Sequence, residues 1–131
     1  MLNPSTADAR LDDPTIRRCL GFARDLGFGS LLVGNLFAWR SASPAGLLEA
    51  ADPAGPENQF HLEAMANECR TILCAWGNGP VLRKLGDGDG RAFLPPALLD
   101  RQMQVLNLSV KGIPSHPLYL KNGTKNFLWQ P

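Results

Sequence analysis

The sequence predicts an α/β fold, a three-layer α/β/α sandwich with a short, mostly parallel sheet. Three apolar runs of strand length, residues 30–36, 71–76 and 104–109, are separated by segments whose apolar residues recur at helical spacing. Strands that alternate with helices pair in parallel through right-handed crossovers, and helices cover both faces of such a sheet. We expect one domain over residues 1–131, in which residues 121–131 form a C-terminal tail.

The first helix has clear start and stop signals. Asp13 can cap free backbone N–H groups, and Pro14 suits the first helical position. Ile16 and Leu20 then recur at helical spacing, and Gly27 supplies the stop. The segment is therefore predicted to be an amphipathic helix.

The later helices are predicted from the same kinds of signal. Ser43-Pro44 opens a short helix, and Leu62, Met65 and Cys69 share one face of a longer one. The expected helices after the first strand cover residues 43–50, 57–70, 80–85 and 96–103.

The start of the chain predicts a shortened first strand. Asn3-Pro4 is typical of the exit from a buried strand, yet only Met1 and Leu2 precede it. We therefore expect the first strand to be a stub or a truncated form, which would leave a central edge of the sheet exposed.

Composition indicates an ordinary globular protein and excludes several functional classes. The 131 residues are 44% hydrophobic and 19% charged, with a formal charge of +1. Proteins that depend on electrostatic binding to nucleic acid are usually strongly basic, and this chain is not. There is no apolar run of membrane-spanning length and no signal peptide pattern, so we expect no membrane association and a cytoplasmic location. The sequence leaves the oligomeric state open.

The cysteines and histidines predict no metal site. Cys19, Cys69 and Cys74 form no C-x-x-C pair, and their odd number argues against a disulfide framework. We interpret them as buried, inert thiols. His61 and His116 are far apart in the sequence and show no ligand spacing, so no metal and no other cofactor is expected.

Polar clusters near the expected strand ends predict a pocket. In an open α/β sheet, ligands bind where strands end at their carboxyl edges. The first cluster contains Asn3 and Asp8. Asn3 can orient a water molecule but cannot take its proton, whereas Asp8 can serve as a base if the loop folds back. The structural alternative is an Asx turn for Asn3 and a helix cap for Asp8.

The other two clusters contribute groups suited to recognising a nucleobase. Asn35 carries both a donor and an acceptor, which suits the edge of a base, and Arg40 can hold a phosphate. A neutral His116 can donate to a developing anion. Phe37 and Tyr119 are candidates for stacking on a base or wedging beside it. The structural alternatives are a turn for Asn35, an ordinary surface side chain for Arg40 and a structural hydrogen bond for His116.

Read together, these motifs resemble an uncharacterised bacterial and phage family, domain of unknown function 1643. The resemblance covers residues 1 to about 120. It is carried by Asn3-Pro4-Ser5-Thr6-Ala7-Asp8, Asp13-Pro14-Thr15, Asn35-Leu36-Phe37-Ala38, Gly55-Pro56-Glu57-Asn58, Ala75-Trp76-Gly77 and Gly112-Ile113-Pro114-Ser115-His116-Pro117-Leu118-Tyr119. Members of that family normally carry more residues before the Asn-Pro motif.

That family in turn is distantly similar to the uracil-DNA glycosylase superfamily. The resemblance implies that Asn3 positions water, that Asn35 reads the base and that His116 faces the base, with a neighbour such as Tyr119 contacting DNA. The leading hypothesis is a pocket for a nucleobase, nucleotide or DNA that hydrolyses an N-glycosidic bond. The alternatives are a non-catalytic module that binds a base, nucleotide or nucleic acid, and a phage or defence-related partner protein with a vestigial pocket. The Asn3-Pro4 motif has no Asp adjacent to its Pro. The cysteines that hold an iron–sulfur cluster in some glycosylases are absent.

Overall fold

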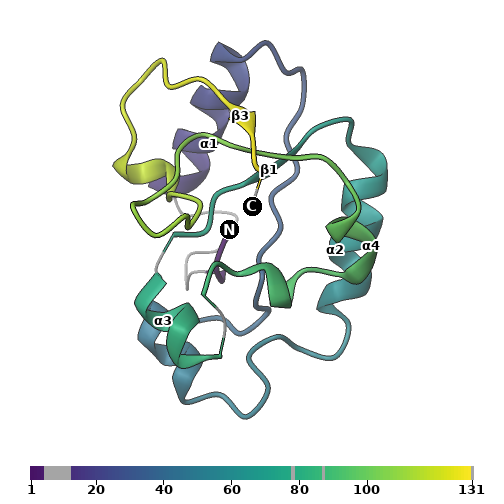
Figure 1. Ribbon diagram of the computed structural model, residues 1–131, viewed down its shortest axis with the longest axis vertical. Coiled ribbons are helices and arrows are strands. Elements are labelled where there is room, and N and C mark those ends of the chain that lie inside the picture. Colours follow the sequence, from purple (N-terminus) through teal and green to yellow (C-terminus); the bar gives the residue numbers. More distant parts are fainter. Residues whose placement is uncertain (5–12, 78, 87, 131) are drawn as a thin grey trace.

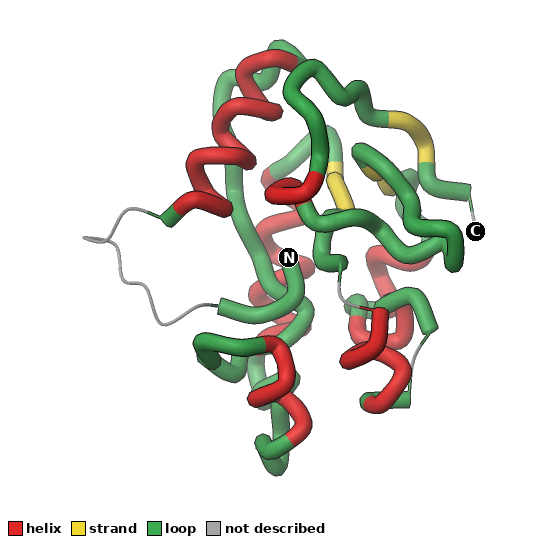
Figure 2. Tube along the Cα trace, turned by 90° about the vertical axis from the view of Figure 1, so that its left-hand side faces the viewer, coloured by secondary structure: helices red, strands yellow, loops and turns green. Residues whose placement is uncertain are grey.

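The protein has a mixed α/β fold in which helices surround a small sheet (Figure 1). The computed structural model describes residues 1–4, 13–77, 79–86 and 88–130. Much of the described chain is loop, as Figure 2 shows. The helices are α1 (Pro14–Asp25), α2 (Asn58–Glu68), α3 (Gly79–Lys84) and α4 (Pro96–Leu99). The strands are β1 (Ile72–Cys74), β2 (Met103–Val105) and β3 (Phe127–Leu128). Short 3₁₀ turns cover Pro44–Leu48, Arg91–Phe93 and Pro117–Tyr119.

Helix α1 forms where its capping signals predict it. The Asp13 carboxylate accepts hydrogen bonds from the backbone N–H groups of Thr15 (2.8 Å) and Ile16 (3.3 Å). Pro14 occupies the first turn, and Gly27 follows the helix with φ 81°. Cap and stop are local features, so they are readable from sequence.

Most of the other expected elements form, several of them over fewer residues than expected. The expected helices over 57–70 and 80–85 correspond to α2 and α3. The helix expected over 96–103 ends at Leu99, because residues from Met103 onward join the sheet as β2.

The sheet is mixed rather than mostly parallel. Its order is β1-β2-β3, and β1 pairs in parallel with β2, with Ile72 opposite Met103. Strand β3 pairs antiparallel with β2, with Gln104 opposite Leu128. The antiparallel partner comes from the segment 121–131 that was expected to be a tail.

Burial of one indole explains why that segment joins the sheet. Trp129 is almost fully buried, and its ring centroid lies 5.6 Å from that of Trp76, edge to face. Its backbone N–H donates to the Met103 carbonyl at 2.8 Å. A tryptophan removes a large apolar area from water, so its packing decides the path of the chain around it.

The expected strand over residues 30–36 does not form. These residues are extended, but within the described chain they belong to no strand, and Leu31 and Leu32 are 36% and 46% exposed. The backbone partner on this segment is Met1, whose amino group donates to the Gly34 carbonyl (2.8 Å) and whose carbonyl accepts from Leu36 N–H (2.9 Å). An apolar run becomes a strand only where a neighbouring edge can pair with it along its length.

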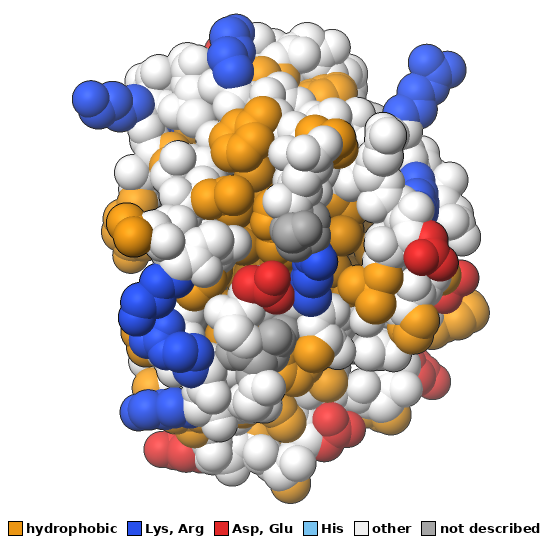
Figure 3. All heavy atoms as spheres, viewed as in Figure 1, with side chains coloured by type: hydrophobic (Ala, Val, Ile, Leu, Met, Phe, Trp, Pro, Cys, Tyr) orange, Lys and Arg blue, Asp and Glu red, His pale blue; other side chains and the backbone are white. Residues whose placement is uncertain are grey.

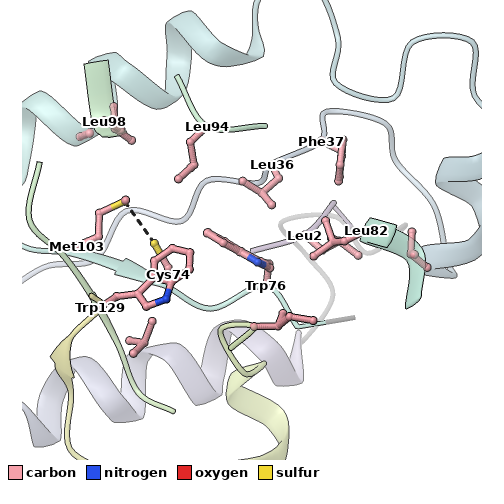
Figure 4. Packing of buried hydrophobic residues seen from close by; sticks show 14 of the residues in the cluster. Leu2, Leu36, Phe37, Cys74, Trp76, Leu82, Leu94, Leu98, Met103 and Trp129 are labelled. Carbon is pink, nitrogen blue, oxygen red and sulfur yellow. Dashed lines mark hydrogen bonds between the residues drawn. The ribbon is translucent and has the colours of Figure 1, made fainter. Parts of the chain in front are cut away.

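The core lies around β1 and β2 and is shown in Figure 4. Cys74 and Met103 are diagonal neighbours across the parallel pair, with their sulfur atoms 3.6 Å apart. Leu2 packs into the same cluster beside Trp76. No helix in the described part of the chain is both long enough and apolar enough to cross a bilayer.

Candidate functional site

The most organised polar group at the ends of the strands is His116. After β2 the chain makes a narrow hairpin in which Leu108 pairs antiparallel with Pro114. Ser115 N–H then donates to the Asn107 carbonyl at 2.9 Å. His116 follows directly and caps the Pro117–Tyr119 turn. The hairpin therefore fixes the backbone on which His116 stands.

The cap defines which ring nitrogen of His116 carries the proton. Its Nδ1 accepts a hydrogen bond from Leu118 N–H at 3.2 Å. A nitrogen that accepts cannot be protonated, so in neutral His116 the proton is on Nε2. The side chain thus offers a single N–H donor from Nε2.

Electrostatics keep this imidazole neutral at pH 7. Partial burial lowers the pKa of His116 below its usual value of about 6.5, and the nearby Met1 amino group lowers it further. The carboxylate of Asp13 acts in the opposite direction but is the weakest of the three influences. His116 is therefore a neutral hydrogen-bond donor under physiological conditions.

Gly77 lets the end of β1 approach His116 closely. It has φ 67°, and a Cβ built there would lie 2.9 Å from the Cβ of His116. Its N–H donates to the Pro114 carbonyl at 2.8 Å, which joins the two loops. Any larger residue would both strain the backbone and displace the imidazole.

Arg18 on α1 holds the chain that follows His116. Its Nε donates to the Pro117 carbonyl at 3.3 Å, and its terminal nitrogens donate to the Leu120 carbonyl and the Asn122 side chain. Arg18 was not identified from the sequence, and Gly77 was identified only as part of the Ala75-Trp76-Gly77 motif, without a role at the site. Their partners lie far along the chain, so no local pattern predicts these contacts.

An aromatic side chain stands beside the imidazole in open solvent. The ring of Tyr119 is 86% exposed, with its centroid 5.8 Å from that of His116 and the planes inclined by 55°. An exposed ring next to a polar donor can stack on a flat ligand. The structure thus brings together two of the residues singled out from the sequence, His116 and Tyr119.

The structure joins Asn3 to the polar cluster of residues 35–40 rather than directly to His116. The Asn3 amide donates to the carbonyls of Pro4 (3.3 Å) and Trp39 (3.4 Å). Leu2, which precedes Asn3, packs beside Trp76, which precedes Gly77. The residues that follow them, Asn3 and Gly77, therefore stand at the ends of neighbouring segments, and of these two it is Gly77 that lies against His116.

The remaining predicted site residues fall elsewhere. Asn35 helps to line a cavity of about 120 Å³ bordered by α2 and α4, and its carbonyl accepts from the Asn58 amide at 2.9 Å. Phe37 was expected to bind a base, but it is fully buried and packs edge to face on Phe93 at 4.7 Å, so it belongs to the core. Arg40 is exposed. Asp8 lies outside the described residues.

The structure also shows where basic side chains gather and whether a metal ion could be held. On the face shown in Figure 3, Lys and Arg side chains gather along the lower left edge, towards α3, which ends in Arg83-Lys84. Among the residues that the structure describes, no three His, Cys, Asp or Glu side chains lie close enough together to hold a metal ion.

Comparison with protein families places the chain in one of them. A family model described as Protein of unknown function (DUF1643) matches residues 1–118. The chain belongs to this family. The match confirms the resemblance carried by the Asn-Pro and His-Pro motifs. Searches of curated proteins and of solved structures find no match to the chain.

Proposed function

We propose that this member of DUF1643 is a nucleobase-binding domain of uracil-DNA glycosylase type, with His116 at the centre of its site. The observation that carries the proposal is the orientation of the imidazole. Its Nδ1 is occupied by Leu118 N–H, which leaves a neutral Nε2–H to donate to a ligand. A carbonyl oxygen of a pyrimidine or purine base can accept the hydrogen bond that this Nε2–H donates.

Three further features support a flat, heterocyclic ligand. Tyr119 offers an exposed ring next to the imidazole. Gly77 brings the end of β1 against His116, so the donor is held in position before a ligand arrives. Helix α1 lies on one side of β1 while α2 and α4 lie on the other (Figure 1), an arrangement compatible with glycosylase-like layering.

The chemistry that such a site can support is hydrolysis of an N-glycosidic bond. The oxygen of a water molecule bonds to C1′ of the sugar while the C1′–N bond breaks. The bonding electron pair leaves with the base, and His116 Nε2–H stabilises the charge that develops on the base oxygen. The proton lost by the water ends on the departing base. Asn3 can orient that water through its amide, although it cannot act as the base.

The first test is binding, measured by calorimetry with free bases, nucleotides and single-stranded DNA. We expect His116→Ala to weaken affinity for a nucleobase about tenfold or more, as the loss of one hydrogen bond to a ligand implies. His116→Gln, which can place an amide N–H near the position of Nε2, should restore part of the loss. His61→Ala is the matched control, because His61 lies exposed on α2, where it contacts Glu57 and the ring of Phe60.

Two results would overturn the proposal. One is that the wild-type chain binds none of these ligands. The other is that His116→Ala and His61→Ala bind equally well. Histidine ring ¹⁵N shifts provide a separate check, because the structure requires a protonated Nε2 and an unprotonated Nδ1 in His116 at pH 7.

The second test separates catalysis from binding. The protein is incubated with uracil-containing and otherwise modified DNA, and released base is measured. If the site is catalytic, His116→Ala should slow release by about a hundredfold or more, and Asn3→Ala should slow it less. Binding without release by the wild-type protein would favour the non-catalytic binding module.

A further inference from the structure

A hollow of about 430 Å³ lies where α3 and the loop after it face the hairpin that follows β2. We call it the α3 hollow, and its lining residues are Arg83, Gly88, Asp89, Lys111 and Ile113. Pockets that hold small molecules have volumes of about 300–1,000 Å³. The α3 hollow therefore has room for a ligand larger than a single ion.

Two cations from separate elements line the α3 hollow. Arg83 belongs to the last turn of α3. Lys111 belongs to the turn of the hairpin, which is closed by a hydrogen bond from Gly112 N–H to the Ser109 carbonyl at 2.9 Å. On the face shown in Figure 3, Lys and Arg side chains gather towards α3. The hollow therefore receives positive charge from two directions.

Packing at the beginning of α3 limits where the Arg83 guanidinium can lie. A Cβ built on Gly79 would be 3.3 Å from a terminal nitrogen of Arg83 and would meet Cδ1 of Ile113. Gly79 and Ile113 are both buried. The guanidinium thus lies against the packed backbone of its own helix, beside the apolar wall of the α3 hollow. A guanidinium that is already held in place loses little freedom when it binds an anion.

The acidic side chain of the α3 hollow is engaged elsewhere. The Asp89 carboxylate accepts a hydrogen bond from Arg91 N–H at 3.0 Å and lies 3.9 Å from Arg91 Nε. Among the residues that the structure describes, no acidic side chain forms an ion pair with Arg83 or Lys111. An anion between these two cations would supply the charge that the protein does not.

The two side chains are of the kinds that bind phosphate. The planar fork of an arginine donates two parallel hydrogen bonds to phosphate oxygens, and a lysine adds a compact positive charge. A nucleic-acid strand requires many such contacts along a strongly basic surface, whereas the whole chain has a formal charge of +1. The charges therefore favour a small phosphorylated molecule over a nucleic acid.

We propose that the α3 hollow binds the phosphate group of a small molecule, held by Arg83 from α3 and by Lys111 from the hairpin. This surface is separate from the His116 side chain, and the inference does not depend on the proposed function.

The test is calorimetry at low ionic strength with inorganic pyrophosphate, which presents phosphate oxygens to both cations. We expect saturable binding by the wild-type protein. Arg83→Gln and Lys111→Gln should each weaken the affinity about fivefold, as the loss of one ion pair at an exposed site implies. Arg83→Lys keeps the charge but loses the fork, so it should lose part of the affinity as well.

Two control substitutions remove the same charge elsewhere. Arg24→Gln matches Arg83→Gln, because Arg24 is an exposed residue in the last turn of α1. Lys125→Gln matches Lys111→Gln, because Lys125 is exposed in the loop before β3. Both controls should leave the affinity for pyrophosphate unchanged.

Three outcomes would overturn the proposal. The first is that the wild-type protein shows no saturable binding of pyrophosphate. The second is that all four glutamine substitutions weaken binding equally, which would mean that only the net charge matters. The third is that a short single-stranded oligonucleotide binds more tightly than pyrophosphate and loses its affinity in Arg83→Gln, which would assign the surface to a nucleic acid.

Discussion

The two sides of β1 are built from similar apolar residues and differ in how they are packed. On the β2 side, Val105 is fully buried and Met103 and Cys74 are in contact. On the other side, the run that contains Leu31 and Leu32 is extended but unpaired, and a cavity of about 550 Å³ separates it from β1. Both runs were expected to be buried strands.

The difference shows that apolar composition is not sufficient to define a strand. The β2 side is completed from the far end of the chain, where β3 and Trp129 cover β2. On the opposite side, among the described residues, only the backbone of Met1 and Leu2 pairs with the backbone of residues 34–37. Hydrogen bonds along a whole edge, together with cover for the side chains, are what turn an apolar run into part of a sheet.

The largest expected effect is on the packed side. Trp129→Ala should lower the free energy of unfolding by about 3–5 kcal/mol, because it removes an indole packed on Trp76 and Arg91 and leaves a cavity. Phe127→Ala, two residues earlier in β3, is the control and should lower it by about 1 kcal/mol or less, since Phe127 is exposed. Urea unfolding measures both. Equal losses would mean that the C-terminal segment does not complete the core.

Two glycines provide a second comparison of the packed and the open side of β1, in which the expected changes in stability are smaller. Gly90 (φ 95°) and Gly27 (φ 81°) both have the left-handed conformation, so alanine costs about 1–2 kcal/mol at either position. A Cβ on Gly90 would also lie 2.5 Å from Trp76 Nε1, whereas one on Gly27 meets nothing within 4 Å. Gly90→Ala should therefore be more destabilising by about another 1–3 kcal/mol. If thermal unfolding shows equal effects, the packing around Trp76 is looser than described.

The smallest effect on stability is expected from chemical modification of the cysteines. The extent of modification reports how accessible each thiol is in the folded protein. Burial raises the pKa of Cys74 to about 12, so almost none of it is thiolate at pH 8. Cys69 lines the cavity of about 550 Å³ beside β1 and is only partly buried. Iodoacetamide followed by mass spectrometry should find Cys69 modified in the folded protein, and Cys74 only after unfolding. Labelling of folded Cys74 at the rate of Cys69 would contradict the close packing of the β2 side.

The sequence by itself determined the elements whose signals are local. The Asp13 cap, Pro14 and Gly27 defined α1, and apolar spacing located α2. The motifs around Asn3 and His116 identified the family. Capping, helical periodicity and turn formation depend on residues a few positions apart, so they can be read along the chain.

Only the tertiary structure decided which segments meet. Burial of Trp129 turned an expected tail into β3, and the lack of a full-length partner left residues 30–36 outside the sheet. The candidate site depends on such contacts too, because Leu118 N–H sets the tautomer of His116 and Gly77, from a distant segment, fixes its position. Strand pairing and the packing of cavity walls bring together residues that are far apart in the chain. The free energy of each contact therefore depends on whether the distant segment packs against it.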